Sequence, residues 1–544
     1  MSTIDWIILI TTLCGIIIYG VYKSRITKDL DGYFLSNRSL PWYMVLLSIM
    51  GTQASAVTFL SAPGQAYTDG MRFVQYYFGL PLAMIVICIF FVPVFRKLKV
   101  YTAYEFLENR FDLKTRSLTS ALFLISRGLS TGISIYAPSI ILSSLLGWNI
   151  YYTNLVMGGV LIIYTITGGA KAVAYTQQLQ LIIIIAGMFL AGYMVINLLP
   201  EGMGFIDAIK VAGSKGKMNI ITTGFSNHNF DWKDKYNIWS GLLGGFFLSL
   251  SYFGADQSQV GRYLTAKSDK ESKIGLLTNG LVKVPMQFFI LLVGILVFSF
   301  YQFHKAPIYF DEARVIVAKK TVYKDSLILL ENQYSDAIKE SNSAGMTELR
   351  ANYKAIIKKA IPGDDANDTN FIFLRFVIEN LPKGLVGLLI AVIFLAAWGS
   401  IAAALNSLAS CTVVDFHKKF INKNCTEAQD YSISKWYTFG WGVFSVVVAM
   451  FAYNLGNSLI EAVNILGSLF YGVILGIFLV AFWIKYVKGN AVFIAAALSE
   501  LLIILIYNLN IVSFLWLNLI GVILVILLSV IIQFVLPSAK KIES

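Results

Sequence analysis

Long apolar stretches, separated by short polar loops, run along almost the whole chain. An apolar run of roughly 20 residues is long enough for a helix to cross a bilayer. On this criterion the sequence predicts thirteen membrane-spanning helices. They are expected near residues 4–22, 41–62, 74–95, 118–146, 150–168, 176–199, 239–258, 276–303, 383–414, 434–454, 459–484, 490–508 and 513–536. The expected fold class is therefore an all-α membrane protein.

Lysine and arginine gather in the loops that follow odd-numbered spans. Examples are the segments "YKSRITKDLDGYFLSNR", "GRYLTAKSDKESK" and "DFHKKFINK". Short loops rich in these residues stay on the cytoplasmic side of a membrane. The regular alternation supports an odd number of spans, and it predicts an outer N-terminus and a cytoplasmic C-terminus.

The composition agrees with a multi-pass protein. Of the 544 residues, 57% are hydrophobic and 14% are charged, which is too little charge to cover a soluble protein of this length. A net charge of +12 could indicate nucleic-acid binding, but the basic residues lie in short loops and are better explained by topology. The start, "MSTIDWIILI", lacks the basic region of a cleaved signal peptide. We expect a plasma (inner) membrane location and no nucleic-acid partner.

Neither cysteine nor histidine forms a metal-binding or redox pattern. The cysteines are Cys14, Cys88, Cys411 and Cys425, and the histidines are His228, His304 and His417. Their spacing predicts neither a disulfide framework nor a metal site.

Two segments on the predicted outer side are long, at about 200–238 and 304–382. The second is charged and rich in helix-forming residues, and we interpret it as a solvated helical cap. Within it, "PGDDANDTN" (362–370) has acidic spacing faintly like that of a calcium loop. It lacks the glycine and the closing glutamate of such loops, so calcium binding is not expected.

Two spans carry polar residues and glycine at mid-membrane. The second contains "GTQASAVTFLSAPG" (51–64), and the seventh, "GLLGGFFLSLSYFGADQSQVGR" (241–262), is interrupted at Ser249, Ser251, Tyr252 and Gly254. A pair of interrupted helices at matching places in two halves indicates an inverted-repeat transporter. Unwound helices expose carbonyl oxygens that can replace the hydration shell of a small cation. Close packing through small residues is the alternative.

The ninth span offers a complementary surface. Ala396, Gly399 and Ser400 recur at helical spacing and lie on one face. This face can approach a broken helix closely, and Ser400 can supply a hydroxyl oxygen. Close helix packing is again an alternative explanation.

Charged residues inside the spans are scarce. Lys283 lies about two turns into the eighth span, where it can bind a solute or extend toward the cytoplasmic face. Glu461 and Glu500 are expected near membrane edges. Because proton-driven transport usually needs an acid within the membrane as a relay, the sequence favours sodium as the coupling ion.

Five motifs in order resemble those of the sodium/solute symporter family, which includes bacterial sodium/galactose, sodium/proline and sodium/sialic acid transporters. They are "GYFLSNRSLPWYMV" (32–45), "VYTAYEFLENRFDLKTR" (100–116), "TGGAKAVAYTQQLQ" (167–180), "GADQSQVGRYLTAKS" (254–268) and "LNSLASCTVVDF" (405–416). The resemblance implies a LeuT-type core of two inverted five-helix repeats.

On this division the chain has five parts. Residues 1–40 hold the first helix and a cytoplasmic loop, 41–199 the first repeat (spans 2–6), 200–238 an extracytoplasmic loop, 239–484 the second repeat (spans 7–11) with the long loop at 304–382, and 485–544 two extra helices and a short tail.

The resemblance also implies a sodium site where spans 2 and 9 cross. Its ligands would be the carbonyl oxygens of Gly51, Ala54 and Ala396 and the hydroxyl of Ser400. Gly399 stands where the family commonly has a second hydroxyl.

Some relatives bind a second sodium ion. The positions that would hold it are Gln177, Ala402 and Ala403 in this chain. Because these residues lack the acid and the hydroxyls, we predict a single coupling sodium.

For the solute, the galactose-transporter pattern implies six residues. They are Thr58, Tyr77, Leu80, Ser249, Tyr252 and Lys283. Tyr77 replaces an acidic sugar ligand, and "SAVTFLSAP" (55–63) resembles the iodide, monocarboxylate and vitamin branch. A lysine without a facing acid suits a carboxylated solute by charge pairing, and a sugar or polyol remains open.

The predicted function is sodium-coupled import of a small organic solute by alternating access, with Na⁺ as coupling ion and no organic cofactor. We expect a working monomer in the lipid bilayer and no enzymatic activity. A passive channel or a solute sensor on the same fold is the alternative, although the tail "PSAKKIES" is too short for a signalling domain. Accumulation against a gradient separates a symporter from a channel.

Overall fold

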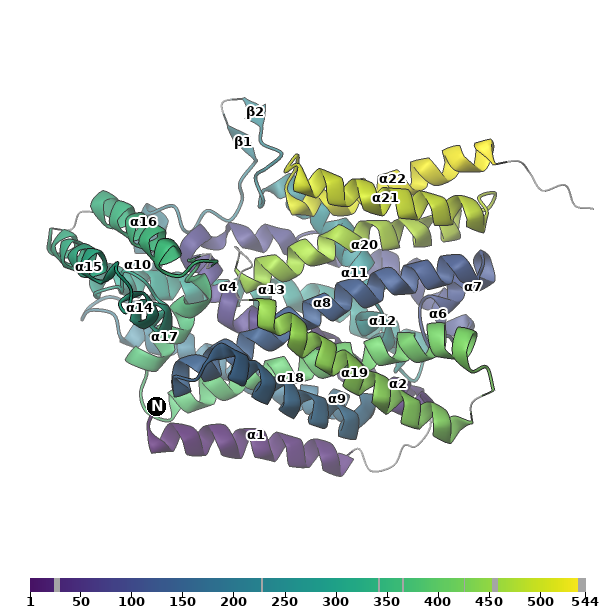
Figure 1. The fold of residues 1–544 in the computed structure, drawn as a ribbon, viewed down its shortest axis with the longest axis horizontal. Helices are drawn as coiled ribbons and strands as arrows, with labels where there is room; N and C mark the ends of the chain where they lie inside the picture. Colours follow the sequence, from purple (N-terminus) through teal and green to yellow (C-terminus); the bar gives the residue numbers. More distant parts are fainter. Residues whose placement is uncertain are drawn as a thin grey trace, which may run out of the picture.

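The computed structural model is a bundle of helices; it describes residues 1–23, 30–226, 228–340, 343–363, 366–424, 426–452 and 458–536 (Figure 1). The chain is 81% helical, and one short antiparallel hairpin, β1 (Phe225–Ser226) with β2 (Asn229–Phe230), projects from one end. The all-α prediction is confirmed.

The helices follow one another in a regular order along the chain. The first half contains α1 (Thr3–Lys23), α2 (Leu30–Leu35), η1 (Ser36–Arg38), α3 (Trp42–Gln53), α4 (Ala56–Asp69), η2 (Gly70–Tyr77), α5 (Leu80–Val86), η3 (Ile87–Phe91), α6 (Val92–Lys97), α7 (Glu105–Arg110), α8 (Leu113–Leu146), α9 (Ile150–Asn197), α10 (Phe205–Ser214), η4 (Ser240–Gly244), α11 (Gly245–Gly254) and α12 (Gln257–Leu264). The second half contains α13 (Asp269–Phe303), α14 (Glu312–Ala318), α15 (Lys324–Lys339), α16 (Ser343–Ala360), η5 (Thr369–Phe371), α17 (Ile372–Asn380), α18 (Leu385–Cys411), η6 (Thr412–Ile421), α19 (Glu427–Phe451), α20 (Leu459–Trp483), α21 (Gly489–Asn508) and α22 (Phe514–Val535).

Within the described residues, nine helical stretches are long and apolar enough to cross a membrane, and two shorter apolar helices, Ile150–Ile166 and Ser240–Gly254, accompany them. The predicted fifth and sixth spans are both contained in α9. A straight helix would separate Tyr164 from Thr176 by about 18 Å, yet their hydroxyls are 2.6 Å apart. The helix therefore bends sharply between these residues, as two successive spans would.

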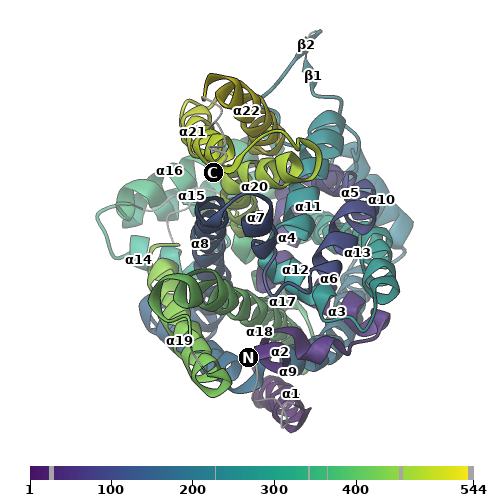
Figure 2. The same ribbon diagram turned by 90° about the vertical axis from the view of Figure 1, so that its right-hand side faces the viewer.

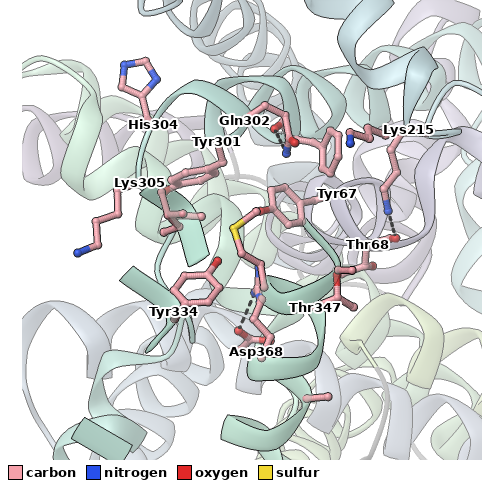
Figure 3. A pocket seen from close by; sticks show the side chains of 18 of the residues that line it. Tyr67, Thr68, Lys215, Tyr301, Gln302, His304, Lys305, Tyr334, Thr347 and Asp368 are labelled. Atoms are coloured by element: carbon pink, nitrogen blue, oxygen red, sulfur yellow. Dashed lines mark hydrogen bonds and ion pairs between the residues drawn. The ribbon is translucent and has the colours of Figure 1, made fainter. Parts of the chain in front are cut away.

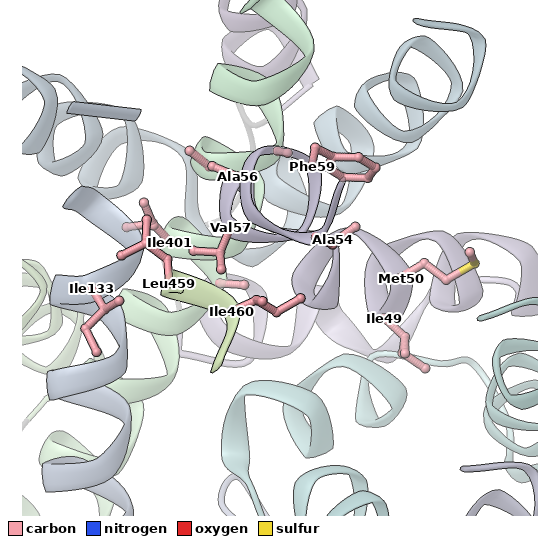
Figure 4. Close-up of a cluster of buried hydrophobic side chains, with 14 of the residues drawn as sticks. Ile49, Met50, Ala54, Ala56, Val57, Phe59, Ile133, Ile401, Leu459 and Ile460 are labelled. Carbon is pink, nitrogen blue, oxygen red and sulfur yellow. The ribbon is translucent and has the colours of Figure 1, made fainter. Parts of the chain in front are cut away.

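The second predicted span is broken, as expected. It consists of α3 and α4, and the chain leaves the helical conformation at Ala54 (ψ 81°) and Ser55 (ψ 169°). The two halves pack into the main core with Ile49, Met50 and Phe59 (Figure 4).

The seventh predicted span is also broken, but not at the residues expected. Ser249 and Gly254 lie within the continuous helix α11, and the break falls at Ala255 and Asp256, before α12. Ser251 does not disrupt the helix because its hydroxyl donates to the carbonyl oxygen of Tyr471 on α20, 2.7 Å away. The Asp256 carboxylate instead accepts from the N–H of Ser258 and so caps the next helix.

Helix α18 runs through the centre of the bundle. All its residues from Leu389 to Cys411 are buried, and it contacts α1, α3, α8 and α9. At its start, the Asp5 carboxylate of α1 accepts from the N–H groups of Gly384 and Gly387. A hydrophobic helix buried on all sides is typical of the interior of a membrane bundle.

The long segment after α13 forms a small helical unit, the cap, from α14, α15 and α16 (Figure 1). The cap has its own apolar core, which includes Leu327, Tyr353 and Ile357. Behind it, the backbone of Thr369 touches Gly64 of α4 so closely that a methyl group at Gly64 would collide with the Thr369 carbonyl oxygen. The segment that joins the cap to α17 therefore rests directly on α4, the second half of the broken span.

The C-terminal helices α21 and α22 pack against α20 at one side of the bundle, and α1 lies at the opposite side (Figure 2). Cys14, Cys88 and Cys411 are free thiols, and Cys425 lies outside the described residues. In the predicted calcium-like segment, Asp364 and Asp365 also lie outside the described residues. Asp368 binds Lys354 and the N–H of Phe310 instead.

Candidate functional site

The break in the second span releases a carbonyl oxygen. In a continuous helix, the N–H of Ser55 would bond to the carbonyl oxygen of Gly51. Here it bonds to that of Gln53, at 3.1 Å, and the N–H of Thr58 turns back to Ser55 at 2.9 Å. The carbonyl oxygen of Gly51 therefore loses its helical partner, which is the condition that an unwound cation site requires.

Gln177 of α9 joins this broken helix to α18. Its side-chain carbonyl accepts from the hydroxyl of Ser48 at 2.8 Å, and its amide group donates to the hydroxyl of Thr52 at 3.2 Å and to the carbonyl oxygen of Gly399 at 3.0 Å. A Cβ on Gly51 would lie 2.9 Å from the Cβ and Cγ of Gln177. Gln177 is thus enclosed between α3 and α18 and links them.

Ala396 and Ser400 lie one turn apart on the buried helix α18. The hydroxyl of Ser400 donates to the carbonyl oxygens of Ala396 and Ala397, at 2.9 and 3.1 Å. This leaves the lone pairs of the Ser400 oxygen available to a cation. Ala54, at the break, is completely buried.

The predicted sodium ligands fit a small monovalent cation by their chemistry. All four are neutral oxygen atoms, three from carbonyl groups and one from a hydroxyl, and hard cations prefer oxygen ligands. In the part of the chain that the structure describes, no three acidic, histidine or cysteine side chains are grouped as a metal site. Neutral ligands do not balance the charge of a bound cation, so this set suits an ion that carries a single positive charge.

The structure explains why position 399 carries glycine. A Cβ there would lie 2.6 Å from Oε1 of Gln180 and 3.2 Å from Cγ of Gln177. A serine at this position would collide with Gln180 unless that side chain moved. Glycine at position 399 therefore supplies no hydroxyl, but it leaves room for Gln177 and Gln180 of α9.

A cavity of about 100 Å³ lies beside the break. We call it the central cavity. It is lined by Gln53, Ser55, Val57, Thr58, Tyr76, Tyr77, Arg127, Leu248, Ser249, Tyr252, Phe253, Ile460, Val463, Asn464, Gly467 and Tyr471. The structure thus brings together four of the six predicted solute residues, Thr58, Tyr77, Ser249 and Tyr252.

The other two predicted solute residues lie outside this lining. Leu80 is buried at the start of α5. Lys283 is 1% exposed and its ammonium group lies 5.7 Å from the ring centre of Tyr77. It therefore does not extend to the membrane surface, and it lies beside a tyrosine that lines the central cavity.

One wall of the central cavity is an ionic cluster. Arg127 of α8 pairs with the carboxylate of Asp256, at the break between α11 and α12. The hydroxyl of Tyr471, on α20, donates to the same carboxylate at 2.8 Å and accepts from Arg127 at 2.9 Å. The guanidinium group also lies 5.3 Å from the ring centre of Tyr252. Four elements meet here, so separating them would open the cavity on this side.

Arg127, Asp256 and Tyr471 are absent from the residues predicted above. A signal for Arg127 was present, because a charged residue inside an apolar span marks a functional site in most membrane proteins. Its partners on α11–α12 and α20 are distant in sequence, and no local pattern indicates them.

Comparisons with known proteins decide the family. The model of the sodium:solute symporter family matches residues 33–334 and 346–499. The chain belongs to the sodium:solute symporter family. The family and its relatives are sodium-coupled transporters rather than enzymes, and the chain is a multi-pass membrane protein.

Individual relatives are similar over most of the chain. The sodium/sialic acid symporter NanT of Aliivibrio fischeri is 26% identical over 97% of this chain and 92% of its own length. The sodium/glucose cotransporter of Vibrio parahaemolyticus is 23% identical over 90% of this chain and 83% of its own. A solved structure of a Na⁺-coupled sialic acid symporter in a substrate-bound, outward-open state matches with a TM-score of 0.79, 23% identity and 99% coverage of both chains. This match shows the fold, which is consistent with a LeuT-like architecture.

Proposed function

We propose that this protein imports a small organic solute together with one sodium ion, by alternating access through the central cavity. The observation that carries the proposal is that one break, in the second span, holds both proposed sodium ligands and residues of the central cavity. Gln53 and Ser55 of this break line the central cavity, and Gly51 and Ala54 next to them are the proposed sodium ligands. The two breaks, in α3–α4 and α11–α12, support an inverted-repeat core.

Sodium and solute are coupled because both contact the same broken helix. A sodium ion held by Gly51, Ala54, Ala396 and Ser400 would tie α3–α4 to α18 and fix the conformation of the break. The wall formed by Gln53, Ser55 and Thr58 would then be ordered for the solute. Such a linkage is reciprocal, so the solute raises the affinity for sodium by the same factor.

A single sodium ion is proposed because Gln177 is neutral and its amide group is already bonded. Ser48, Thr52 and Gly399 take up its hydrogen-bonding capacity. Ala402 and Ala403 offer no side-chain oxygen. A second cation at this level of the bundle would have no charged ligand among these residues.

The preferred solute class is an organic carboxylate. Arg127 presents a guanidinium group to the central cavity, and arginine binds carboxylates through paired hydrogen bonds. Thr58 and Ser249 add hydroxyl groups beside it. In the present conformation Asp256 neutralises Arg127, so a carboxylate would compete with Asp256 and loosen the ionic cluster below the cavity. A sugar or polyol is the second candidate, because the cavity also has hydroxyl-rich walls.

The central cavity of about 100 Å³ is small compared with typical ligand pockets, which are of the order of 300–1,000 Å³. Solute entry therefore requires the helices to separate. The ionic cluster of Arg127, Asp256 and Tyr471 lies on the side of the cavity where α12 begins. Helix α12 runs away from the cap and ends at a basic loop. We assign this cluster to the inner gate.

Uptake into proteoliposomes tests the proposal. Radiolabelled N-acetylneuraminate, pyruvate and glucose would be supplied with an inward sodium gradient or with choline. For glucose, which is neutral, one sodium charge at about 100 mV contributes about 2.3 kcal/mol, which concentrates the sugar roughly fiftyfold. Pyruvate and N-acetylneuraminate carry one negative charge, so their entry with one sodium ion is electroneutral and is driven by the sodium concentration gradient alone. Accumulation of one of these solutes above the outside concentration with sodium alone supports symport. Equal rates with sodium and choline reject sodium coupling, and equilibration without accumulation indicates a channel.

A further inference from the structure

A second, larger cavity lies between the cap and the bundle (Figure 3). We call it the cap cavity. Its volume is about 970 Å³. It is lined by the ends of α4 and α13, by the turn after α10, by α15 and α16, and by Asp368. None of its residues belongs to the central cavity, so it is a separate space.

The cap cavity has a strong excess of positive charge. Its basic residues are Lys215, Lys217, Lys305, Arg350 and Lys354, and its one acidic residue is Asp368. The composition of the segment does not explain this excess, because residues 304–382 contain eleven basic and eleven acidic residues. Described acids of this segment pair outside the cavity: Glu331 binds Lys319, for example, and Asp336 binds Lys339.

Asp368 cannot neutralise the five cations, because its oxygens are already engaged. Lys354 binds it at 2.6 Å, Arg350 lies at 3.6 Å, and the N–H of Phe310 donates to it at 2.9 Å. Asp368 is 1% exposed. Its role is to join the cap to the segment that precedes α17.

The three remaining lysines form no ion pair with any described residue. They are Lys215, Lys217 and Lys305, and the ammonium group of Lys305 donates to the hydroxyl of Ser335 at 3.3 Å. Lys217 bonds to the carbonyl oxygen of Thr68 and lies 5.3 Å from the ring centre of Phe298. Burial lowers the pKa of its ammonium group, and the nearby carboxylate of Asp69 only partly opposes this effect. A lowered pKa in a lysine indicates that its positive charge is poorly compensated.

Aromatic rings form the rest of the cavity wall. Tyr67, Phe298, Tyr301 and Tyr334 line it, and Figure 3 shows the rings of Tyr67, Tyr301 and Tyr334 around the same space. The guanidinium group of Arg350 interacts with the hydroxyls of Tyr67 and Tyr334 and lies over the ring of Phe310. Cations beside aromatic faces suit a ligand with an acidic group and an organic body, because each part then finds a complementary surface.

We propose that the cap cavity is a binding site for small organic carboxylates, distinct from the transport site and independent of sodium. An anion here would meet Lys215 and Lys217, and its organic part would contact the tyrosines. Lys305 lies across the cavity from Lys215 (Figure 3) and adds to the positive charge around it. The binding itself does not depend on the proposed symport. Only its use depends on that function: a carboxylate held beside Tyr67 of α4 would be concentrated next to the outer half of the broken helix.

The test is isothermal titration of the full-length protein in nanodiscs, in sodium-free choline buffer. Glucuronate and glucose form a matched pair, because they share a ring and differ in the carboxylate. Pyruvate and N-acetylneuraminate extend the series. At least one acid is expected to bind and glucose is not. Exposed charge pairs contribute modestly, so the variant K215Q/K305Q should weaken this binding by about three- to tenfold.

The control variant K320Q/K358Q removes two exposed lysines from the same cap, outside the cavity, and should leave the affinity unchanged. Ser249→Leu, which fills part of the central cavity, should also leave it unchanged. The proposal is overturned if no acid binds at millimolar concentration, if both lysine variants weaken binding equally, if Ser249→Leu abolishes it, or if inorganic phosphate competes as well as the acids. Sodium-driven uptake is measured separately, so failure of one proposal does not imply failure of the other.

Discussion

Ser400 provides the most direct test of the sodium site. Its hydroxyl bonds only to carbonyl oxygens of its own helix, so Ser400→Ala should fold normally. Loss of a ligand to a charged group costs about 1.5–3 kcal/mol, which corresponds to a ten- to hundredfold weaker sodium affinity. The measurement is the sodium concentration for half-maximal uptake or thermal stabilisation.

Ser407→Ala is the matched control for this change. Ser407 is also buried on α18 and its hydroxyl donates to the carbonyl oxygen of Ala403 at 2.8 Å. It lies about two turns from Ser400. An equal loss of sodium affinity in both variants would show that the effect is structural and would remove Ser400 from the site.

Gly51 tests the contact between the break and Gln177. A methyl group at Gly51 would lie 2.9 Å from two carbons of Gln177, and three hydrogen bonds hold that side chain in place. Gly51→Ala should therefore lower the free energy of unfolding by about 1–3 kcal/mol, as overpacking does, and weaken sodium binding. Gly15→Ala on α1, where no atom lies within 4 Å, should do neither. Thermal unfolding with and without sodium compares the two.

Single residues show where sequence reasoning succeeds and where it stops. Thr58 and Ser249 were predicted as solute residues through the resemblance to galactose transporters, and both line the central cavity. The position of Lys283 beside Tyr77 could not be predicted from the residues, because it depends on how α13 is rotated against η2. The role of Gln177 as a link between α3 and α18 depends in the same way on three helices that are far apart in sequence.

At the scale of elements, the pair of Arg127 and Asp256 joins α8 to the break before α12. Arg127→Gln leaves a buried carboxylate without its counter-ion, which costs about 3–5 kcal/mol. The double variant Arg127→Gln with Asp256→Asn removes both charges and should recover much of the stability. Thermal unfolding gives the two values, and the single variant is expected to lose transport because the inner gate no longer closes.

Lys319→Gln serves as the control for this pair. Lys319 forms an ion pair with Glu331 at 2.7 Å, and the two side chains are 33% and 30% exposed, so its loss should cost less than about 1 kcal/mol. If Arg127→Gln were equally mild, or if the double variant were no more stable than the single one, the ionic cluster would not be a gate.

The two breaks were predictable to different degrees. The first break follows from Gly51, whose backbone can leave the helical conformation at low cost, and from the polar residues after it. No proline lies at this break. In the second, serine hydroxyls suggested a break too early. Ser251 finds a partner on α20, and the helix continues until Asp256 can cap its successor. Tertiary hydrogen bonds, which sequence does not display, decide such boundaries.

At the scale of the whole molecule, the predicted orientation in the membrane can be tested by labelling. In a variant without native cysteines, Ala355→Cys lies on the exposed surface of the cap and Lys423→Cys lies in the basic loop after η6. A membrane-impermeant maleimide should label the first in intact cells and the second only after permeabilisation. The reverse pattern would mean that the charge rule misassigns the sides.

The order of helices along the chain was largely recoverable from apolar runs, because each membrane span must satisfy its own backbone. The count of thirteen spans stays a prediction: within the described residues, nine stretches are long and apolar enough to cross a membrane. The way in which the helices pack together was less predictable. The central place of α18 is suggested by its alanine and glycine content, but the contact of Asp5 with Gly384 and Gly387 is visible only in the structure. The cap cavity combines residues from α4, the turn after α10, α13, α15 and α16 and has no local signature.

The tight backbone contact between Gly64 and Thr369 has a practical consequence. Backbone meets backbone at this junction with no side chain between them, so α4 cannot slide along the segment that contains Thr369. If that half-helix tilts during a cycle, the cap must tilt with it. A spin label or fluorophore fixed on the cap would then report this motion, because a small rotation of the half-helix displaces the distant cap far enough to follow in real time.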